Sequence, residues 1–408
     1  MTLCAPLALA QHSHHAADDG EPWASGTSWQ PAAAGMEGRH FTPGGWRLMV
    51  HGKLDLAWTK QSGPRGTSEG FFASMLMASG ERDVGPGSLL LRAMASAEPL
   101  LGPEGYPLLL QTGEIDDENE PLVDRQHPHD LVMELAAAYR LPIGPRARTF
   151  VYGGLPGEPA LGPAAFMHRP SAMPNPVAPI SHHWFDSTHI SFGVVSLGAS
   201  FAGLKLDASL FNGREPDAAR WGFETGALDS RSARLTWNPS AAWSLQASYG
   251  RLRAPESLHP DVDVDRTTLS AQWSEQLGKL RLDALLAVGR NRRSAPLSRS
   301  PFSIYGPQQT LEAALFEWAL GWGGPERAFL RAEWVEKDEL FSRRDPFHAR
   351  VFPVSKLDVG LKRELPGGLP GAPALGAAFS LHRLPEFLEP DYGRHPKGFT
   401  AFLSLSLR

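Results

Sequence analysis

From residue 46 to its end the chain repeats a two-residue alternation of apolar and polar side chains. The clearest segment is 46–59. One of its faces carries Trp46, Leu48, Val50, Gly52, Leu54, Leu56 and Trp58, and the other carries Arg47, Met49, His51, Lys53, Asp55, Ala57 and Thr59. A period of two is that of a β-strand, whereas a helix with this pattern would have charge all round it. The pattern therefore predicts strands with one apolar and one polar face, with Trp46 and Trp58 at the level of interfacial aromatic girdles.

The alternation recurs often enough to predict sixteen strands. They are expected at 45–60, 70–80, 87–98, 129–140, 147–154, 186–199, 201–213, 228–238, 242–253, 264–275, 279–290, 310–321, 327–337, 354–365, 372–383 and 398–408, and the segment 129–140 could also be a helix. Single-chain bacterial outer-membrane barrels have an even number of strands. A strand of about twelve residues spans roughly 40 Å, which is enough to cross an apolar band of about 25 Å when it is tilted.

The connections between these strands alternate strictly between short turns and long loops. This is the arrangement of a barrel whose turns face the periplasm and whose loops face outward. The competing fold is a large soluble all-β protein, but its buried positions would favour Val and Ile, whereas Leu, Ala, Gly and aromatic residues dominate here. The fold class is therefore predicted to be all-β: a single antiparallel transmembrane β-barrel of about 16 strands in the outer membrane of a Gram-negative bacterium, with lipid as its outer partner.

Composition and the N-terminus add the domain organisation. Charged residues make up 20% of the chain and the net charge is -5, so nucleic acid is not an expected partner. Residues 1–10, with Cys4 and an Ala8-Leu9-Ala10 ending, are interpreted as the remnant of a signal peptide. The alternative is an apolar N-terminal tail of a cytoplasmic protein. Residues 11–44 are expected to form a His-containing periplasmic arm, and 45–408 the barrel.

One stretch of the chain resembles a known family. Phe211-Asn212-Gly213-Arg214-Glu215-Pro216-Asp217 leads through Ser232-Ala233-Arg234-Leu235-Thr236 to Asn238-Pro239. It is similar to the strand–loop–strand unit of phosphate-selective porins and to uncharacterised porin-like outer-membrane proteins of Gram-negative bacteria. The resemblance implies the wall of a pore, for which a homotrimer is one assembly, and it transfers no anion site.

Charged side chains on the polar faces of the strands are expected to line the pore. The predicted pore-lining residues are Arg47, Lys53, Asp55, Arg92, Glu98, Lys205, Asp207, Arg234, Arg281, Arg331, Glu333, Lys356 and Asp358. Both signs are present and basic residues are slightly in excess. The pore is therefore predicted to be weakly selective, with a slight preference for anions.

Histidines concentrate in the long loops and in the N-terminal arm. The loop positions are His127, His129, His168, His182, His183 and His189, with Met167 and Met173 among them, and the arm carries His12, His14 and His15. Neutral imidazole is the commonest metal ligand, and thioethers suit Cu(I). No cofactor is certain, but the pattern allows a copper or zinc site. The alternative is that these histidines hold the long loops together.

Two loops have unusual composition. The loop 155–185 contains seven prolines, which favours a constriction loop folded into the lumen, with a rigid surface cap as the alternative. The acidic run Glu114–Glu120 could attract divalent cations, although such runs are more often simply solvated.

These observations favour an outer-membrane channel for passive diffusion of small solutes. The first alternative is a barrel that binds or responds to copper or zinc. The second is a lipid-modifying enzyme, for which Asp186, Ser187, His189 and Ser191 are the candidate residues. Hydrolase, metalloprotease and phosphate-loop signatures are absent from the sequence, so an enzyme is not predicted.

Overall fold

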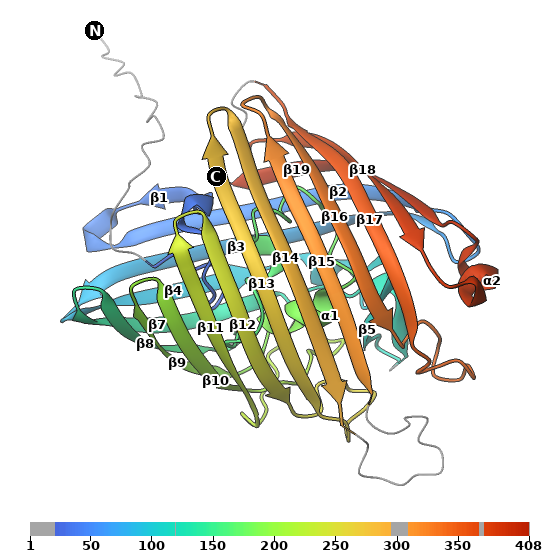
Figure 1. The fold of residues 1–408 in the computed structure, drawn as a ribbon, viewed down its shortest axis with the longest axis horizontal. Helices are drawn as coiled ribbons and strands as arrows, with labels where there is room; N and C mark the ends of the chain where they lie inside the picture. The colour runs from blue at the N-terminus through green and yellow to red at the C-terminus, as the bar shows by residue number, and fades with distance from the viewer. Residues whose placement is uncertain (1–20, 119, 295–308, 367–370, 408) are drawn as a thin grey trace.

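The computed structural model describes residues 21–118, 120–294, 309–366 and 371–407 of the chain. Figure 1 shows a closed antiparallel barrel with further segments inside it. The predicted signal-peptide remnant and the first ten residues of the arm, with His12, His14 and His15, lie outside the described residues.

Sixteen strands form the barrel wall, as the sequence predicts. They are β2 (Arg47–Gln61), β3 (Ser68–Val84), β4 (Gly87–Ala95), β7 (Val132–Gly144), β8 (Ala147–Gly154), β9 (Val194–Phe201), β10 (Leu204–Phe211), β11 (Ser230–Ser240), β12 (Trp243–Leu252), β13 (Val264–Leu277), β14 (Leu280–Arg293), β15 (Thr310–Gly321), β16 (Glu326–Lys337), β17 (Phe352–Glu364), β18 (Ala374–Arg383) and β19 (Lys397–Leu407). Each wall strand pairs antiparallel with its neighbours, and β19 pairs with β2 to close the barrel. No edge is left open in the wall, which is the condition for a sheet to span a membrane.

Smaller elements complete the described part of the chain. The short strand β1 (Arg39–Phe41) pairs with β2, and β5 (Tyr106–Ile115) pairs with β6 (Pro121–Gln126) in a separate hairpin. The helices are η1 (Ala32–Ala34), η2 (Pro43–Gly45), η3 (Glu98–Leu101), η4 (Phe166–His168), α1 (His182–Phe185), η5 (Ser187–His189), η6 (Glu386–Leu388) and α2 (Glu389–Tyr392). In the described residues no helix has both the length and the apolar character needed to cross a bilayer.

The predicted strand at 186–199 is wrong in its first half. In the structure β9 begins at Val194, and residues 187–189 form the helix η5. The His189 side chain and the Ser191 hydroxyl both turn back onto nearby backbone carbonyls, and such local hydrogen bonds compete with strand pairing. The segment 129–140 is a strand from Val132 onward and not a helix.

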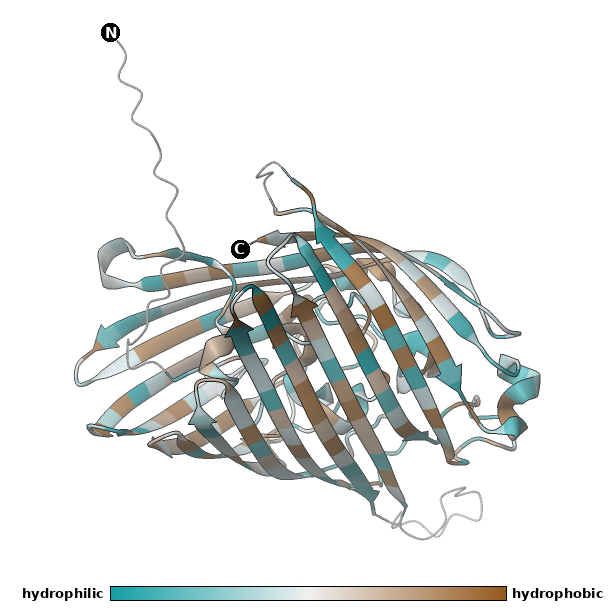
Figure 2. Cartoon of the chain, turned by 45° about the horizontal axis from the view of Figure 1, so that its top comes forward, coloured by the Kyte–Doolittle hydropathy of each residue, from teal (hydrophilic) through white to brown (hydrophobic). Residues whose placement is uncertain are grey.

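Alternate residues of each strand face opposite sides of the wall, and Figure 2 shows the alternation as bands along the strands. On β10, Leu206 is 59% exposed on the outer face, while its neighbours Lys205 and Asp207 are each 1% exposed on the inner face. Trp243 and Trp273 stack with ring centroids 5.9 Å apart beside the short turns. An outer surface that is apolar, with aromatic residues near its border, is suited to lipid.

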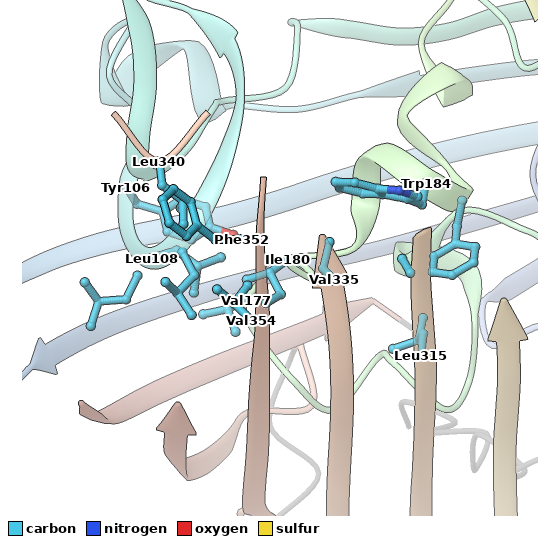
Figure 3. Packing of buried hydrophobic residues seen from close by; sticks show 14 of the residues in the cluster. Tyr106, Leu108, Val177, Ile180, Trp184, Leu315, Val335, Leu340, Phe352 and Val354 are labelled. Atoms are coloured by element: carbon cyan, nitrogen blue, oxygen red, sulfur yellow. The ribbon is translucent and has the colours of Figure 1, made fainter. Parts of the chain in front are cut away.

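The interior differs from a uniformly polar channel. The inner faces of β14–β17 carry apolar residues such as Leu315, Val335 and Val354, which pack on Ile180 and Trp184 of the connection between β8 and β9 (Figure 3). The prediction of a polar inner face is therefore wrong for this part of the wall, because the wall there contacts protein and not water.

Candidate functional site

The connection between β8 and β9, residues 155–193, runs through the lumen and is attached to the wall at several points. Ala160 N–H donates to Ser209 Oγ on β10 at 2.7 Å, and Ser181 Oγ donates to Glu333 Oε1 on β16 at 2.8 Å. The Arg169 guanidinium is fully buried and donates to Asp186 and to Glu317 of β15, each at 2.7 Å. The inward fold expected for the proline-rich loop is confirmed, and we call residues 155–193 the inner loop.

The described part of the N-terminal arm also enters the lumen. Thr27 Oγ1 donates to Asp207 on β10 at 2.6 Å, and Arg234 on β11 donates to Thr27 Oγ1 at 2.8 Å. Trp29 is buried, and the Lys205 ammonium lies 5.0 Å from the centre of its ring. Residues 21–36, here called the N-terminal segment, thus fill a second part of the lumen beside β10 and β11.

Most of the predicted pore-lining charges lie against these two segments. Asp55, Arg92, Glu98, Lys205, Asp207, Arg234, Arg331, Glu333, Lys356 and Asp358 are buried on the inner side of the barrel. Lys53 and Arg281 line an open vestibule and also contact these segments, Lys53 through the Met173 carbonyl and Arg281 through the carbonyls of Ala33 and Ala34. Arg47 lies near the short turn between β3 and β4 and pairs with Glu81 and Asp83 at 2.9 and 3.0 Å. The buried charges form ion pairs, such as Arg234–Asp207 at 2.8 Å and Lys356–Asp358 at 3.0 Å.

Two neighbouring cavities lie inside the barrel. The vestibule has a volume of about 570 Å³ and is lined by both inner segments and the wall, with five basic and four acidic side chains around it. A smaller cavity of about 50 Å³ lies deeper and is lined by Asp55, Glu98 and His129 among others. Lys53 and Met173 line both cavities, so the two are neighbours.

Five of the six predicted histidine ligands gather at the inner end of this route. His127 and His129 precede β7, and His182, His183 and His189 belong to the inner loop. The ring centroids of His189 lie 5.2 Å from those of both His129 and His182, and those of His127 and His182 are 5.8 Å apart. We call these five residues the histidine cluster.

Each imidazole of the cluster has its Nδ1 close to an oxygen. His129 Nδ1–H donates to Glu98 Oε2 at 2.8 Å, His182 Nδ1–H to Asp186 Oδ1 at 2.7 Å, and His189 Nδ1–H to the Asp186 carbonyl at 2.7 Å. The corresponding contacts are His183 Nδ1 to Glu215 Oε1 at 3.0 Å and His127 Nδ1 to the Pro128 carbonyl at 3.3 Å. Backbone carbonyls and carboxylates accept hydrogen bonds, so the Nδ1 atoms of His127, His129, His182 and His189 carry protons.

The Nε2 atoms of His129, His182, His183 and His189 are buried and have no hydrogen-bond partner among the described residues. His127 Nε2 lies 3.3 Å from Glu114 Oε1. In a neutral imidazole whose Nδ1 carries the proton, Nε2 presents a lone pair. A buried polar atom without a partner costs about 1–3 kcal/mol, so four in one cluster require an explanation.

Burial keeps most of the cluster neutral. It lowers the pKa of His127, His182 and His189, and it lowers the pKa of His183 to about 4. Burial also opposes the charged form of His129, but the Glu98 carboxylate outweighs it and raises that pKa.

The sixth predicted ligand, His168, lies apart from the cluster among methionines. Its Nε2 is 3.3 Å from Met94 Sδ, and its ring centroid is 6.4 Å from that of His51. The neighbouring buried methionines belong to four wall strands and the inner loop. They are Met49, Met75, Met77, Met94 and Met133, with Met167 packed against them.

The other candidate residues have different surroundings. Within the acidic run, Glu114 is paired with Arg220, and Asp116 accepts from the backbone N–H groups of Glu118 and Glu120. In the proposed hydrolase set, Ser191 Oγ donates to the Thr188 carbonyl and His189 Nδ1 contacts the Asp186 carbonyl. That arrangement does not place the histidine as a base for the serine.

One further group was not expected from the sequence. Glu256, His259 and Glu339 have ligand atoms that all lie within 4.8 Å of one another. Among the described residues, this is the group of three His, Cys, Asp or Glu side chains whose ligand atoms lie that close together. Glu256 accepts from Arg293 at 2.8 Å, and Arg293 lies 3.7 Å from Glu339.

Two further groups were not predicted from the sequence. They are the residues that orient the histidines, and the methionines that face inward. Glu98 appeared only as a pore-lining charge, and Met49 appeared as one position of an alternating strand. An apolar thioether at polar-face positions of β2, β3 and β4 was the signal that could have identified the methionine group.

Comparison with solved structures finds the same architecture at low sequence identity. The chain is similar to OmpF of Salmonella typhi, solved in complex with daunomycin, with a TM-score of 0.55 and 10% identity over 90% of this chain and 100% of that one. It is also similar to an anion-selective porin from Comamonas acidovorans, with a TM-score of 0.52 and 12% identity over 88% of this chain and 99% of that one. No family model and no curated protein matches the chain.

These likenesses concern the fold. Together with the closed wall and the apolar outer face, they place the chain in the outer membrane as a sixteen-stranded barrel of porin-like architecture.

Proposed function

We propose that the protein is an outer-membrane channel for passive diffusion of small solutes along a narrow internal route. The observation that carries this proposal is the vestibule, with a smaller cavity beside it, inside a closed barrel. The inner loop and the N-terminal segment occupy much of the remaining lumen, so the solutes must be small. No catalytic role is assigned to any residue.

The charges along the route support weak selectivity. Five basic and four acidic side chains line the vestibule, and the charges deeper in the barrel are compensated by ion pairs. Such a lining gives only a slight preference for anions. The resemblance to phosphate-selective porins is therefore not extended to a phosphate site.

Liposome swelling tests the size limit. Liposomes that contain the purified protein should swell in isotonic solutions of the smallest solutes and fail to swell with disaccharides. Reversal potentials in a salt gradient should lie close to zero, with a small shift toward anions. A barrel that is impermeable to all solutes and ions contradicts the proposal.

A homotrimer in lipid or detergent is the assembly we propose, on the strength of the resemblance of the sequence to porins. Light scattering of the detergent-solubilised protein measures it. A mass of one chain after subtraction of the detergent would rule out the trimer without affecting the channel.

A further inference from the structure

The histidine cluster has the two layers of a metal centre. An inner layer of imidazoles has Nε2 atoms without hydrogen-bond partners, and an outer layer of Glu98 and Asp186 accepts from the Nδ1 atoms of His129 and His182. Metal-binding histidines almost always donate their second ring N–H to a carboxylate or a carbonyl, which fixes the ring and makes it a stronger ligand. Most buried side-chain polar atoms have a hydrogen-bond partner, and these Nε2 atoms have none among the described residues.

The spacing of His189 from its two neighbours suits one ion. Imidazoles bound through nitrogen at about 2.0 Å in a tetrahedral arrangement have ring centres about 5 Å apart. His189 is 5.2 Å from His129 and 5.2 Å from His182 between ring centroids. Binding requires the three Nε2 atoms to turn toward one point. His127 and His183 border the three.

The smaller cavity borders one of these three histidines. His129 lines the smaller cavity, and the thioethers of Met75, Met167 and Met173 line it as well. Met173 also borders the vestibule, together with His51 and His168. Thioether sulfur is a soft ligand that favours Cu(I), whereas carboxylates and carbonyls suit Mg²⁺ and Ca²⁺.

We propose that His129, His182 and His189 form a transition-metal site in the lumen, and that its metal is copper in preference to zinc. The proposal goes beyond that of a diffusion channel and does not depend on it, because a barrel could bind copper without conducting and conduct without binding copper. The group at Glu256, His259 and Glu339 is a weaker candidate because the Arg293 cation lies against two of its carboxylates.

Metal titration of the purified full-length protein tests the site. Cu(II), Cu(I) under a reductant, and Zn(II) are titrated separately, and bound metal is measured after gel filtration. The wild type is expected to retain stoichiometric copper that zinc does not displace. The triple variant His129→Gln/His182→Gln/His189→Gln should lose that copper. The matched control His395→Gln, at an exposed histidine outside the cluster, should bind as the wild type does.

Two further measurements keep the proposal falsifiable if the triple variant folds poorly. Glu98→Gln leaves all five histidines in place and should weaken copper binding by about 10–100-fold, because it removes the carboxylate that orients His129. X-ray absorption of the copper-loaded wild type should show imidazole nitrogens at about 2.0 Å.

Several results would overturn the proposal. They are wild-type protein that retains no copper, copper binding that is unchanged in a folded triple variant, and copper displaced by equimolar zinc. Loss of binding in Glu256→Gln but not in the triple variant would move the site to the other group. Conductance is measured in parallel, so a failed metal titration with an intact channel is distinguishable from failure of the proposed function.

Discussion

The two faces of a single strand show what surrounds this barrel and what fills it. On β10, Leu204, Leu206 and Leu210 are exposed outward, while Lys205 and Asp207 are almost completely buried inward. A soluble protein has the opposite arrangement. The difference shows that the outer face is suited to lipid. It also shows that the charged inner face packs against the inner loop and the N-terminal segment, whose polar groups form hydrogen bonds with it.

The strongest test of the inner face is the removal of Arg169. Arg169→Leu removes one buried partner from each of Asp186 and Glu317, and breaking a buried ion pair costs about 3–5 kcal/mol. Urea unfolding in detergent micelles measures the loss of stability. The matched control is Arg290→Leu. Arg290 on β14 pairs with Glu312, which lies on β15 as Glu317 does, but this pair is exposed and is worth about 0–1 kcal/mol. Equal effects of the two substitutions would show that the inner ion pairs are solvated.

The outer face is tested by placing a charge in the apolar band. Leu286→Arg, in the middle of β14, should destabilise the protein by about 2–4 kcal/mol in lipid, because the side chain is exposed toward the acyl chains. Leu277→Arg, beside a short turn, should cost about 0–1 kcal/mol, since it reaches the interface. Folding in lipid vesicles, followed by urea titration, compares the two. If Leu286→Arg were harmless, the lipid-facing assignment of β14 would fail.

The smallest effect is expected where the N-terminal segment meets the wall. Thr27→Val removes the hydroxyl that donates to Asp207 and accepts from Arg234, which should cost about 1–3 kcal/mol. Thr42→Val at an exposed position is the control. Unfolding midpoints in the same micelles are sufficient for this comparison. Indistinguishable midpoints for the two variants would indicate that the segment is only loosely placed.

The wall could be predicted from the sequence because each strand carries its own evidence. An alternation such as that of β2 specifies both the strand and its two faces. The lengths of the connections then predict which end of the barrel faces the periplasm. The beginning of β9 was predicted wrongly because the alternation continues into residues 187–193, where His189 and Ser191 bond to the local backbone instead of a neighbouring strand.

The filling of the lumen was only partly predictable. The seven prolines of the inner loop indicated an ordered loop, and its histidines indicated a site. Its contacts with Leu315 and Val335, however, depend on how strands far apart in the sequence come together. For the same reason the sequence suggested six equivalent histidines, while the fold separates His168 from the other five. Hydrogen bonds to Glu98 and Asp186 orient His129, His182 and His189.

The central claim is that the segments inside the barrel, and not the wall, limit what passes through it. Single-channel conductance in planar bilayers tests this directly when the full chain is compared with a chain that begins at Met36 and so lacks the N-terminal segment. The full chain should show small conductance steps, and the shortened chain steps several-fold larger at the same salt concentration. Equal steps for two correctly folded proteins would contradict the account.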